Sequence, residues 1–324
     1  MIKRVVIILL IFFTLSCQKQ LIRVSNDKGI IYINSSGKVV IDKSFKKGSE
    51  FSESLCSVSL DGESWGYINK LGEEVIPYRY QGALDFSQGL AAVLLDNKWG
   101  FINKNGVLVI PYKFRSATSF NNGVSRVELL DKTLFIDKRG EVIYSSPYSY
   151  IGLFKEDLAP FMSDNKFGYV NILGEVIISA EFSYAGDFSQ GLAPVFKGKR
   201  AGYIDKSGEW VTEDVYSYVT GFSNGLAYVE GNSLKGYINT KGVIVIKTEY
   251  DYSYPFFNNL ARVVDNGKHG FIDRSGRLII KPTWDFAKDF SFGLTTVYID
   301  NRPMVINTKG EVIYNLSHER DNNN

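Results

Sequence analysis

A glycine recurs every 34 residues along most of the chain. The series runs through Gly66, Gly100, Gly168, Gly202, Gly236 and Gly270, and only Leu134 interrupts it. A fixed period of this size indicates a repeat array, in which neighbouring units share a continuous core. The sequence therefore predicts one long array in place of the two ordinary domains that 324 residues suggest.

Each repeat is interpreted as three β-strands joined by two hairpins and followed by a connector. In one copy the strands are expected at 90–95, 100–103 and 107–114, with polar turn residues between them. Nine such units are expected over residues 21–316. The fold class is therefore all-β, a tandem array of three-stranded antiparallel β-meander units.

The two ends of the array favour an open solenoid or superhelix over a closed β-propeller. Ile31 and Met304 replace the glycine in the first and ninth units, which is typical of capping units. Propeller blades usually have four strands and number four to eight. No terminal unit is split between the two ends of the chain, so nothing in the sequence indicates how a ring would be locked. The closed propeller is kept as the alternative.

Two turns recur in each unit. One begins with Asn or Asp and ends with Gly, as in Asn103 and Gly106, and it is expected to be a hairpin with an Asx-turn and a left-handed glycine. The other reads Phe-Ser-x-Gly-Leu, as in Phe188 to Leu192, and it is expected to be a tight turn that buries its Phe and its Leu.

These motifs resemble those of the WG repeat, also called the KWG repeat, of bacterial proteins. Lys98, Trp99 and Gly100 state the motif in full. The chain departs from it at the Trp position, where the replacements are Phe167, Ala201, Lys235 and His269. The resemblance implies an extracytoplasmic β-repeat scaffold without a common catalytic activity.

Residues 1–16 are expected to be a signal peptide. Lys3 and Arg4 precede an unbroken apolar run over residues 5–13, which is too short to span a bilayer. The following Thr-Leu-Ser-Cys resembles the lipobox of bacterial lipoproteins, which implies cleavage before Cys17 and acylation of that residue. The alternative is a plain secretory signal in which Cys17 is incidental.

The mature chain is then expected to be lipid-anchored to a bacterial envelope. Residues 17–20 would form a tether, and residues 317–324 a polar tail. Gln18 follows the cysteine where an Asp commonly retains lipoproteins at the inner membrane, so the outer membrane is the expected location, on its periplasmic or surface face.

The composition argues against several kinds of chemistry. Loss of Lys3 and Arg4 with the signal peptide takes the 37 basic residues to 35, equal to the 35 acidic ones, so no nucleic-acid partner is expected. The two histidines, His269 and His318, have no metal-ligand partners at useful spacing. No phosphate loop or nucleophile motif is found. We therefore expect no catalytic residues, no metal and no cofactor.

Aromatic residues are the remaining candidates for binding. Those singled out are Tyr150, Tyr184, Tyr218 and Tyr252. They could grip a glycan or a protein, or they could simply pack between units. The predicted function is a non-catalytic, membrane-anchored scaffold that binds a protein or glycan partner. The alternatives are a structural envelope protein without a ligand and a glycan-active hydrolase.

Overall fold

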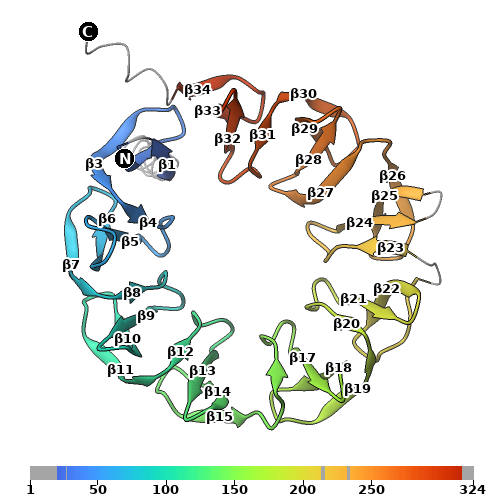
Figure 1. Ribbon diagram of the computed structural model, residues 1–324, viewed down its shortest axis with the longest axis horizontal. Coiled ribbons are helices and arrows are strands. Elements are labelled where there is room, and N and C mark those ends of the chain that lie inside the picture. The colour runs from blue at the N-terminus through green and yellow to red at the C-terminus, as the bar shows by residue number, and fades with distance from the viewer. Residues whose placement is uncertain (1–19, 27, 213–215, 232–233, 316–324) are drawn as a thin grey trace, which may run out of the picture.

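The computed structural model describes residues 20–26, 28–212, 216–231 and 234–315, and all the regular secondary structure in these residues is β-strand. The strands form nine small antiparallel sheets that follow one another around a ring (Figure 1). Each sheet comes from a continuous stretch of chain, with its strands in sequence order. The all-β prediction is confirmed.

The strands fall into four positions within a sheet. First strands are β4 (Lys47–Gly48), β8 (Gly82–Ala83), β12 (Ser116–Ala117), β16 (Tyr150–Ile151), β20 (Tyr184–Ala185), β23 (Tyr216–Val219), β27 (Tyr252–Phe257) and β31 (Phe286–Ala287). Second strands are β1 (Ile22–Asn26), β5 (Leu55–Ser59), β9 (Leu90–Leu95), β13 (Ser125–Leu129), β17 (Leu158–Ser163), β21 (Leu192–Lys197), β24 (Leu226–Gly231), β28 (Leu260–Asp265) and β32 (Leu294–Ile299).

Third strands are β2 (Gly29–Ile33), β6 (Trp65–Asn69), β10 (Lys98–Asn103), β14 (Lys132–Ile136), β18 (Lys166–Asn171), β22 (Arg200–Asp205), β25 (Leu234–Asn239), β29 (Lys268–Asp273) and β33 (Arg302–Asn307). Fourth strands are β3 (Val39–Phe45), β7 (Glu74–Tyr80), β11 (Leu108–Phe114), β15 (Val142–Ser145), β19 (Val176–Phe182), β26 (Ile244–Lys247), β30 (Leu278–Trp284) and β34 (Val312–Asn315).

We number the sheets as blades 1 to 9. They are β1–β3, β4–β7, β8–β11, β12–β15, β16–β19, β20–β22, β23–β26, β27–β30 and β31–β34. Among the described residues seven blades have four strands, so the prediction of three-stranded units is wrong for these. The additional strand is the first one, which has only two residues in five of these blades, as in blade 3, where Gly82 and Ala83 pair with Leu94 and Val93. A two-residue strand is too short to leave an alternating pattern in the sequence.

The hydrophobic core lies between the blades. Between blades 2 and 3 it contains Tyr67 from β6 together with Phe86 and Val93 from the next blade. The aromatic residue of a third strand meets the connector Phe of the following blade in eight such pairs, with ring centroids 4.7 to 5.2 Å apart. Edge-to-face and tilted contacts of this kind add to the burial energy of the rings.

A ninth core cluster closes the ring, so the preference for an open solenoid is wrong. Ile22, Val24, Ile31 and Ile33 of blade 1 are buried against Leu294 and Val305 of blade 9. Ile31, which we interpreted as a cap residue, is part of this contact. The first and last blades lie side by side in Figure 1. Closure needs no split blade because the apolar faces of the two terminal blades cover each other.

The hairpin glycines repeat the same inter-blade contact around the ring. Gly106 lies against Ile76 of the blade before it, and Gly276 lies against Ile246. Gly37 of blade 1 lies in the same way against Ile313 of blade 9, where a Cβ atom would collide with the backbone. These glycines have φ near +80°, so the left-handed turn is confirmed.

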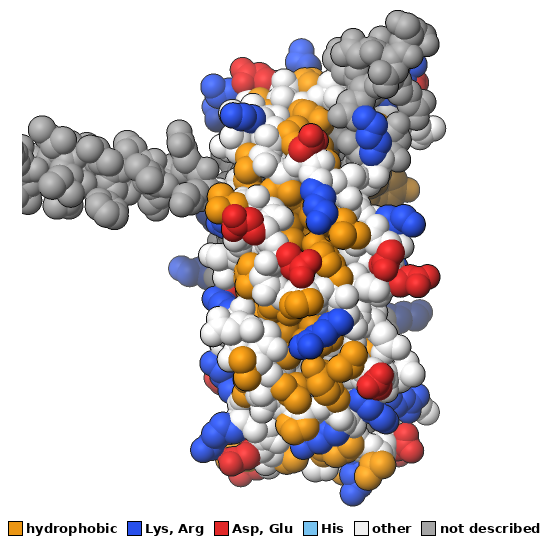
Figure 2. All heavy atoms as spheres, turned by 90° about the vertical axis from the view of Figure 1, so that its left-hand side faces the viewer, with side chains coloured by type: hydrophobic (Ala, Val, Ile, Leu, Met, Phe, Trp, Pro, Cys, Tyr) orange, Lys and Arg blue, Asp and Glu red, His pale blue; other side chains and the backbone are white. Residues whose placement is uncertain are grey.

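The fourth strands lie at the outer rim, as β7, β11 and β30 show in Figure 1. Their outward-facing residues, such as Val40, Val75 and Val109, are exposed. Figure 2 shows the apolar stripe along the outside of the ring, with charged side chains at both of its sides and single ones across it. Because the strands of each sheet follow in order, the first strands are at the opposite edge, toward the middle of the ring.

Candidate functional site

The four tyrosines singled out from the sequence occupy one register on four consecutive blades. Tyr150, Tyr184 and Tyr252 begin the first strands of their blades, and Tyr218 pairs with Glu230 at the equivalent place. Phe286 begins the first strand of blade 9 and extends the series to a fifth blade. We call these five residues the aromatic ladder.

The rings of the aromatic ladder are exposed. Their exposed fractions lie between 45% for Tyr150 and 65% for Tyr252. The third-strand aromatic residues that meet the connector Phe, such as Tyr67, Tyr169 and Tyr203, are by contrast buried in the core. Packing between units therefore does not account for the ladder, and these rings are free to contact another molecule.

Tyr184 lies close enough to the two neighbouring ladder tyrosines to interact with them electrostatically. The pKa of Tyr184 is raised by burial, by the carboxylate of Asp187, and by the adjacent Tyr150 and Tyr218. Tyr150, Tyr184 and Tyr218 thus follow one another along the ring of blades.

The ladder and the Trp of the repeat motif are almost mutually exclusive. In blade 3, Gly82 of the first strand and Trp99 of the third strand both pair with Leu94 of β9, which lies between them. A Cβ atom at Gly82 would lie 3.3 Å from the indole of Trp99. In blade 6 the equivalent residues are Tyr184 in the first strand and Ala201 at the Trp position, which both pair with Phe196. The aromatic residue at this level of the sheet is thus in the third strand of blade 3 and in the first strand of blade 6, where its ring is more exposed.

A second aromatic ring supports most of the ladder rings. Tyr150 lies edge-to-face on Phe167 with centroids 5.7 Å apart, and Tyr184 lies on Phe196 at 5.3 Å. The supporting ring is Tyr228 for Tyr218, at 6.2 Å, and Tyr298 for Phe286, at 5.7 Å. Such contacts restrict the rotamers of the exposed rings.

A cavity of about 350 Å³ lies between the ladder rings of blades 5 and 6. Its lining consists of Tyr150, Pro160, Tyr184, Ala185, Gly186, Asp187, Ser189, Pro194 and Gly221. Burial raises the pKa of Asp187, and the positive charge of Lys155 partly offsets that effect. The cavity therefore combines the side chains of two tyrosines and two prolines with an exposed carboxylate.

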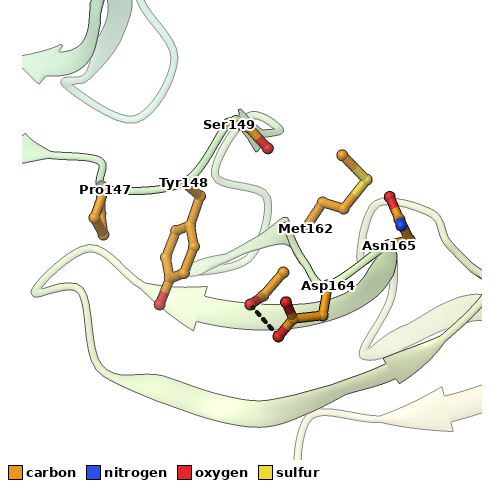
Figure 3. Close-up of a pocket in the computed structure, with 7 residues that line it drawn as sticks. Pro147, Tyr148, Ser149, Met162, Asp164 and Asn165 are labelled. Atoms are coloured by element: carbon orange, nitrogen blue, oxygen red, sulfur yellow. Dashed lines mark hydrogen bonds between the residues drawn. The ribbon is translucent and has the colours of Figure 1, made fainter.

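A second cavity, of about 310 Å³, lies beside Tyr150 in blade 5. Figure 3 shows Tyr148 and Pro147 on one side of it and Met162, Asp164 and Asn165 on the other. The hydroxyl of Ser163 donates a hydrogen bond to the carboxylate of Asp164 at 3.3 Å. Met162 pairs directly with Tyr150, so this cavity adjoins the start of the ladder.

Two cations near the ladder are paired with carboxylates. Lys235 lies 3.2 Å from Glu230 in the row of Tyr218, and Arg262 lies 3.0 Å from Asp289. The Arg262 guanidinium also lies 3.6 Å from the ring centroid of Tyr254. Burial and Arg262 lower the pKa of His269, which favours the neutral imidazole. The cations Lys235 and Arg262 near the ladder are therefore compensated by carboxylates.

Cys17 and the signal peptide lie outside the described residues. Among the residues that are described, no group of three or more His, Cys, Asp and Glu side chains could hold a metal ion. No helix in the described part of the chain is long and apolar enough to cross a membrane.

Sequence reasoning missed Phe286 and the cavity between blades 5 and 6. Phe286 lies one repeat of 34 residues after Tyr252, so the repeat period alone identifies it as the next member of the series. Asp187 directly precedes the connector Phe188, but nothing in the sequence shows that it lines a cavity with two tyrosines and two prolines.

The family model of the WG containing repeat matches eight stretches of the chain. They are residues 32–63, 65–99, 99–132, 135–167, 167–200, 202–233, 236–268 and 270–302. The chain belongs to the WG repeat family. The expected resemblance is thereby confirmed at the level of the repeat. No curated protein matches this WG repeat chain.

Two solved structures illustrate what this WG repeat protein is similar to. A eukaryotic initiation factor is 10% identical, with a TM-score of 0.63 over 91% of this chain and 94% of that one. BamB from Moraxella catarrhalis is 12% identical over 91% and 98% of the two chains, at a TM-score of 0.42. Only the initiation factor has a TM-score above 0.5, and at 10% identity its similarity concerns the fold alone. The fold is that of a nine-bladed β-propeller.

Proposed function

We propose that this WG repeat propeller is a non-catalytic scaffold that binds a protein or glycan partner through the aromatic ladder. The observation that supports the proposal is the set of five exposed rings at one register of consecutive blades. Exposed aromatic rings with rigid support are characteristic of binding surfaces, because they offer a large contact area at little cost in conformational entropy.

The experiment is site-specific photo-crosslinking in the producing cells. Benzoylphenylalanine replaces Tyr218 in the full chain, and the same photoreactive residue replaces Phe292 as a matched control. Phe292 is an exposed aromatic residue, at 48%, but it lies in a connector turn and outside the ladder. A product at Tyr218 that is missing at Phe292 supports the proposal. Equal products at both positions, or none at either, contradict it.

The proposal includes a lipid anchor at Cys17 and a location in the bacterial envelope, expected at the outer membrane. Its support is the sequence of the first 17 residues, with two basic residues, an apolar run and a lipobox-like ending. Labelling with a radioactive fatty acid tests the anchor: incorporation is expected in the wild type and not in Cys17→Ala. Protease treatment of intact cells against lysed cells then tells whether the propeller faces the surface or the periplasm.

A further inference from the structure

We propose that the aromatic ladder binds a linear, uncharged polysaccharide, whose sugar rings lie against the exposed faces of Tyr150, Tyr184, Tyr218, Tyr252 and Phe286. This inference rests on the proposed binding function and names the ligand class.

The repetition of the rings indicates a polymer. A small molecule would contact the one or two rings around a single cavity, which gives no reason for the same residue type on blades 5 to 9. A chain of similar units can make the same contact at each blade, so its affinity increases through linked weak contacts. The N-terminal blades lack the feature, since Gly82 and Ser116 occupy the same register there.

The chemistry of the ladder fits sugars. Tyrosine offers a flat apolar face together with a polar hydroxyl, which suits a ligand that has apolar C–H faces and polar edges. Tyr150 and Tyr184 stand on Phe167 and Phe196, so little rotamer freedom is lost when a ligand covers them.

The charge distribution favours an uncharged chain. Lys235 is paired with Glu230, and Arg262 with Asp289, so no free cationic row is present among them to bind an anionic polymer. Nucleic acids and acidic polysaccharides need such a row because their binding depends on charge neutralisation.

Asp187 provides a directional contact in the cavity between Tyr150 and Tyr184. A carboxylate is an acceptor only, and the Asp187 side chain is exposed where it lines the cavity. Two neighbouring sugar hydroxyls can donate to its two oxygens as charge-assisted hydrogen bonds. The cavity volume, about 350 Å³, falls within the usual size range of small-ligand sites.

The test measures binding of the purified full-length protein to defined polymers by isothermal titration calorimetry and affinity electrophoresis. The probes are neutral glucans, xylans, mannans and galactans with their oligosaccharides, the anionic polysaccharide alginate, polyproline, and polylysine. We expect a neutral polysaccharide to bind, with an affinity that rises with oligosaccharide length. Tyr184→Ala and Tyr218→Ala should each weaken it about tenfold, whereas Phe292→Ala should not. Melting curves verify that the variants are folded.

Asp187→Asn separates the ligand classes. For a neutral sugar it should weaken binding only several-fold, because the amide keeps an acceptor. A preference for polylysine that Asp187→Asn abolishes would overturn the inference in favour of a cationic ligand. Binding of polyproline alone, or of no neutral polysaccharide, also overturns it. If crosslinking at Tyr218 then still yields a protein partner, the proposed function stands without the sugar; if it yields nothing, both fail.

Discussion

Buried tyrosine hydroxyls join neighbouring blades. Tyr203 in β22 donates a hydrogen bond of 2.6 Å to the carbonyl of Thr220, which lies in the next blade. Tyr32, Tyr67, Tyr169 and Tyr237 make the same bond to the residue 17 positions ahead. Phe101 occupies the same position without a hydroxyl, so the ring alone supports the packing there.

Tyr203→Phe should therefore lower the free energy of unfolding by about 1–2 kcal/mol, since the buried Thr220 carbonyl loses its side-chain donor. Urea denaturation measures the change. Tyr252→Phe, at a ring that is 65% exposed, is the matched control and should leave the midpoint within error. Equal midpoints for Tyr203→Phe and the wild type would show that the hydrogen bond contributes nothing net.

The connector phenylalanines should have larger effects. Phe188 is buried, and its ring centroid lies 4.8 Å from that of Tyr169. Phe188→Ala leaves a cavity between blades 5 and 6, and we expect a loss of about 3–5 kcal/mol. Thermal melting followed by circular dichroism measures it. Phe292→Ala, on the surface, should change stability by less than about 0.5 kcal/mol. An unchanged melting curve for Phe188→Ala would disprove the assigned packing.

At the scale of the element, the hairpin turns should make the fold sensitive to acid. Asp205 accepts hydrogen bonds from the Ser207 hydroxyl and from the backbone N–H groups of Ser207 and Glu209, and these bonds lower its pKa. The pKa values of Asp137 and Asp273 are lowered by similar bonds. A carboxyl whose pKa is lower in the folded state stabilises the fold above its unfolded pKa, about 3.9. That stabilisation is lost as the pH falls toward the folded pKa.

The triple variant Asp137→Asn, Asp205→Asn, Asp273→Asn tests this. Asparagine occupies the same turn position at Asn103 and accepts the same backbone bonds, so the turns should persist. We expect the variant to lose less stability than the wild type as the pH falls from about 4 to about 2. The readout is the urea midpoint as a function of pH. Parallel curves would mean that these carboxylates do not contribute to the acid response.

Turns and strands were predictable because each depends on the preference of a few residues. Asp157 and Asn259 replace the turn glycine and adopt positive φ, at 75° and 69°, as expected for the residues that tolerate it best. The short first strands could not be predicted, since their pairing follows from where the connector lies after the blades have packed. The ladder tyrosines were identified from their residue type and spacing, but their exposure depends on their position in these first strands.

At the scale of the molecule, closure is a property that no single repeat contains. The rotation from one blade to the next must sum to one full turn over nine blades, and small differences in packing accumulate around the ring. Ile31 illustrates the difficulty: taken alone, an isoleucine in place of the repeat glycine indicates a cap, yet in the ring it fills the contact between blades 1 and 9. The same substitution is compatible with the open end of a superhelix or with a seam, the contact between the first and last blades of a closed ring.

The seam between blades 1 and 9 supplies the decisive test of the ring. Ile31→Asp puts an unpaired charge into a cluster that contains Leu294 and Val305, so the two blades should separate while the other inter-blade contacts remain. Small-angle scattering should show a larger radius of gyration, and circular dichroism should retain the strand signal. The milder Ile31→Ala should stay closed and lose about 2–5 kcal/mol of stability.

Val40→Asp is the control, because Val40 is an exposed residue of the same blade at the outer rim. It should change neither the radius nor the stability appreciably. If Ile31→Asp behaves like Val40→Asp, the terminal blades do not hold the ring together, and an open superhelix again becomes the better description. If only Ile31→Asp expands, the propeller is closed by side-chain packing between its two terminal blades, and the curvature of the ladder on blades 5 to 9 depends on that contact.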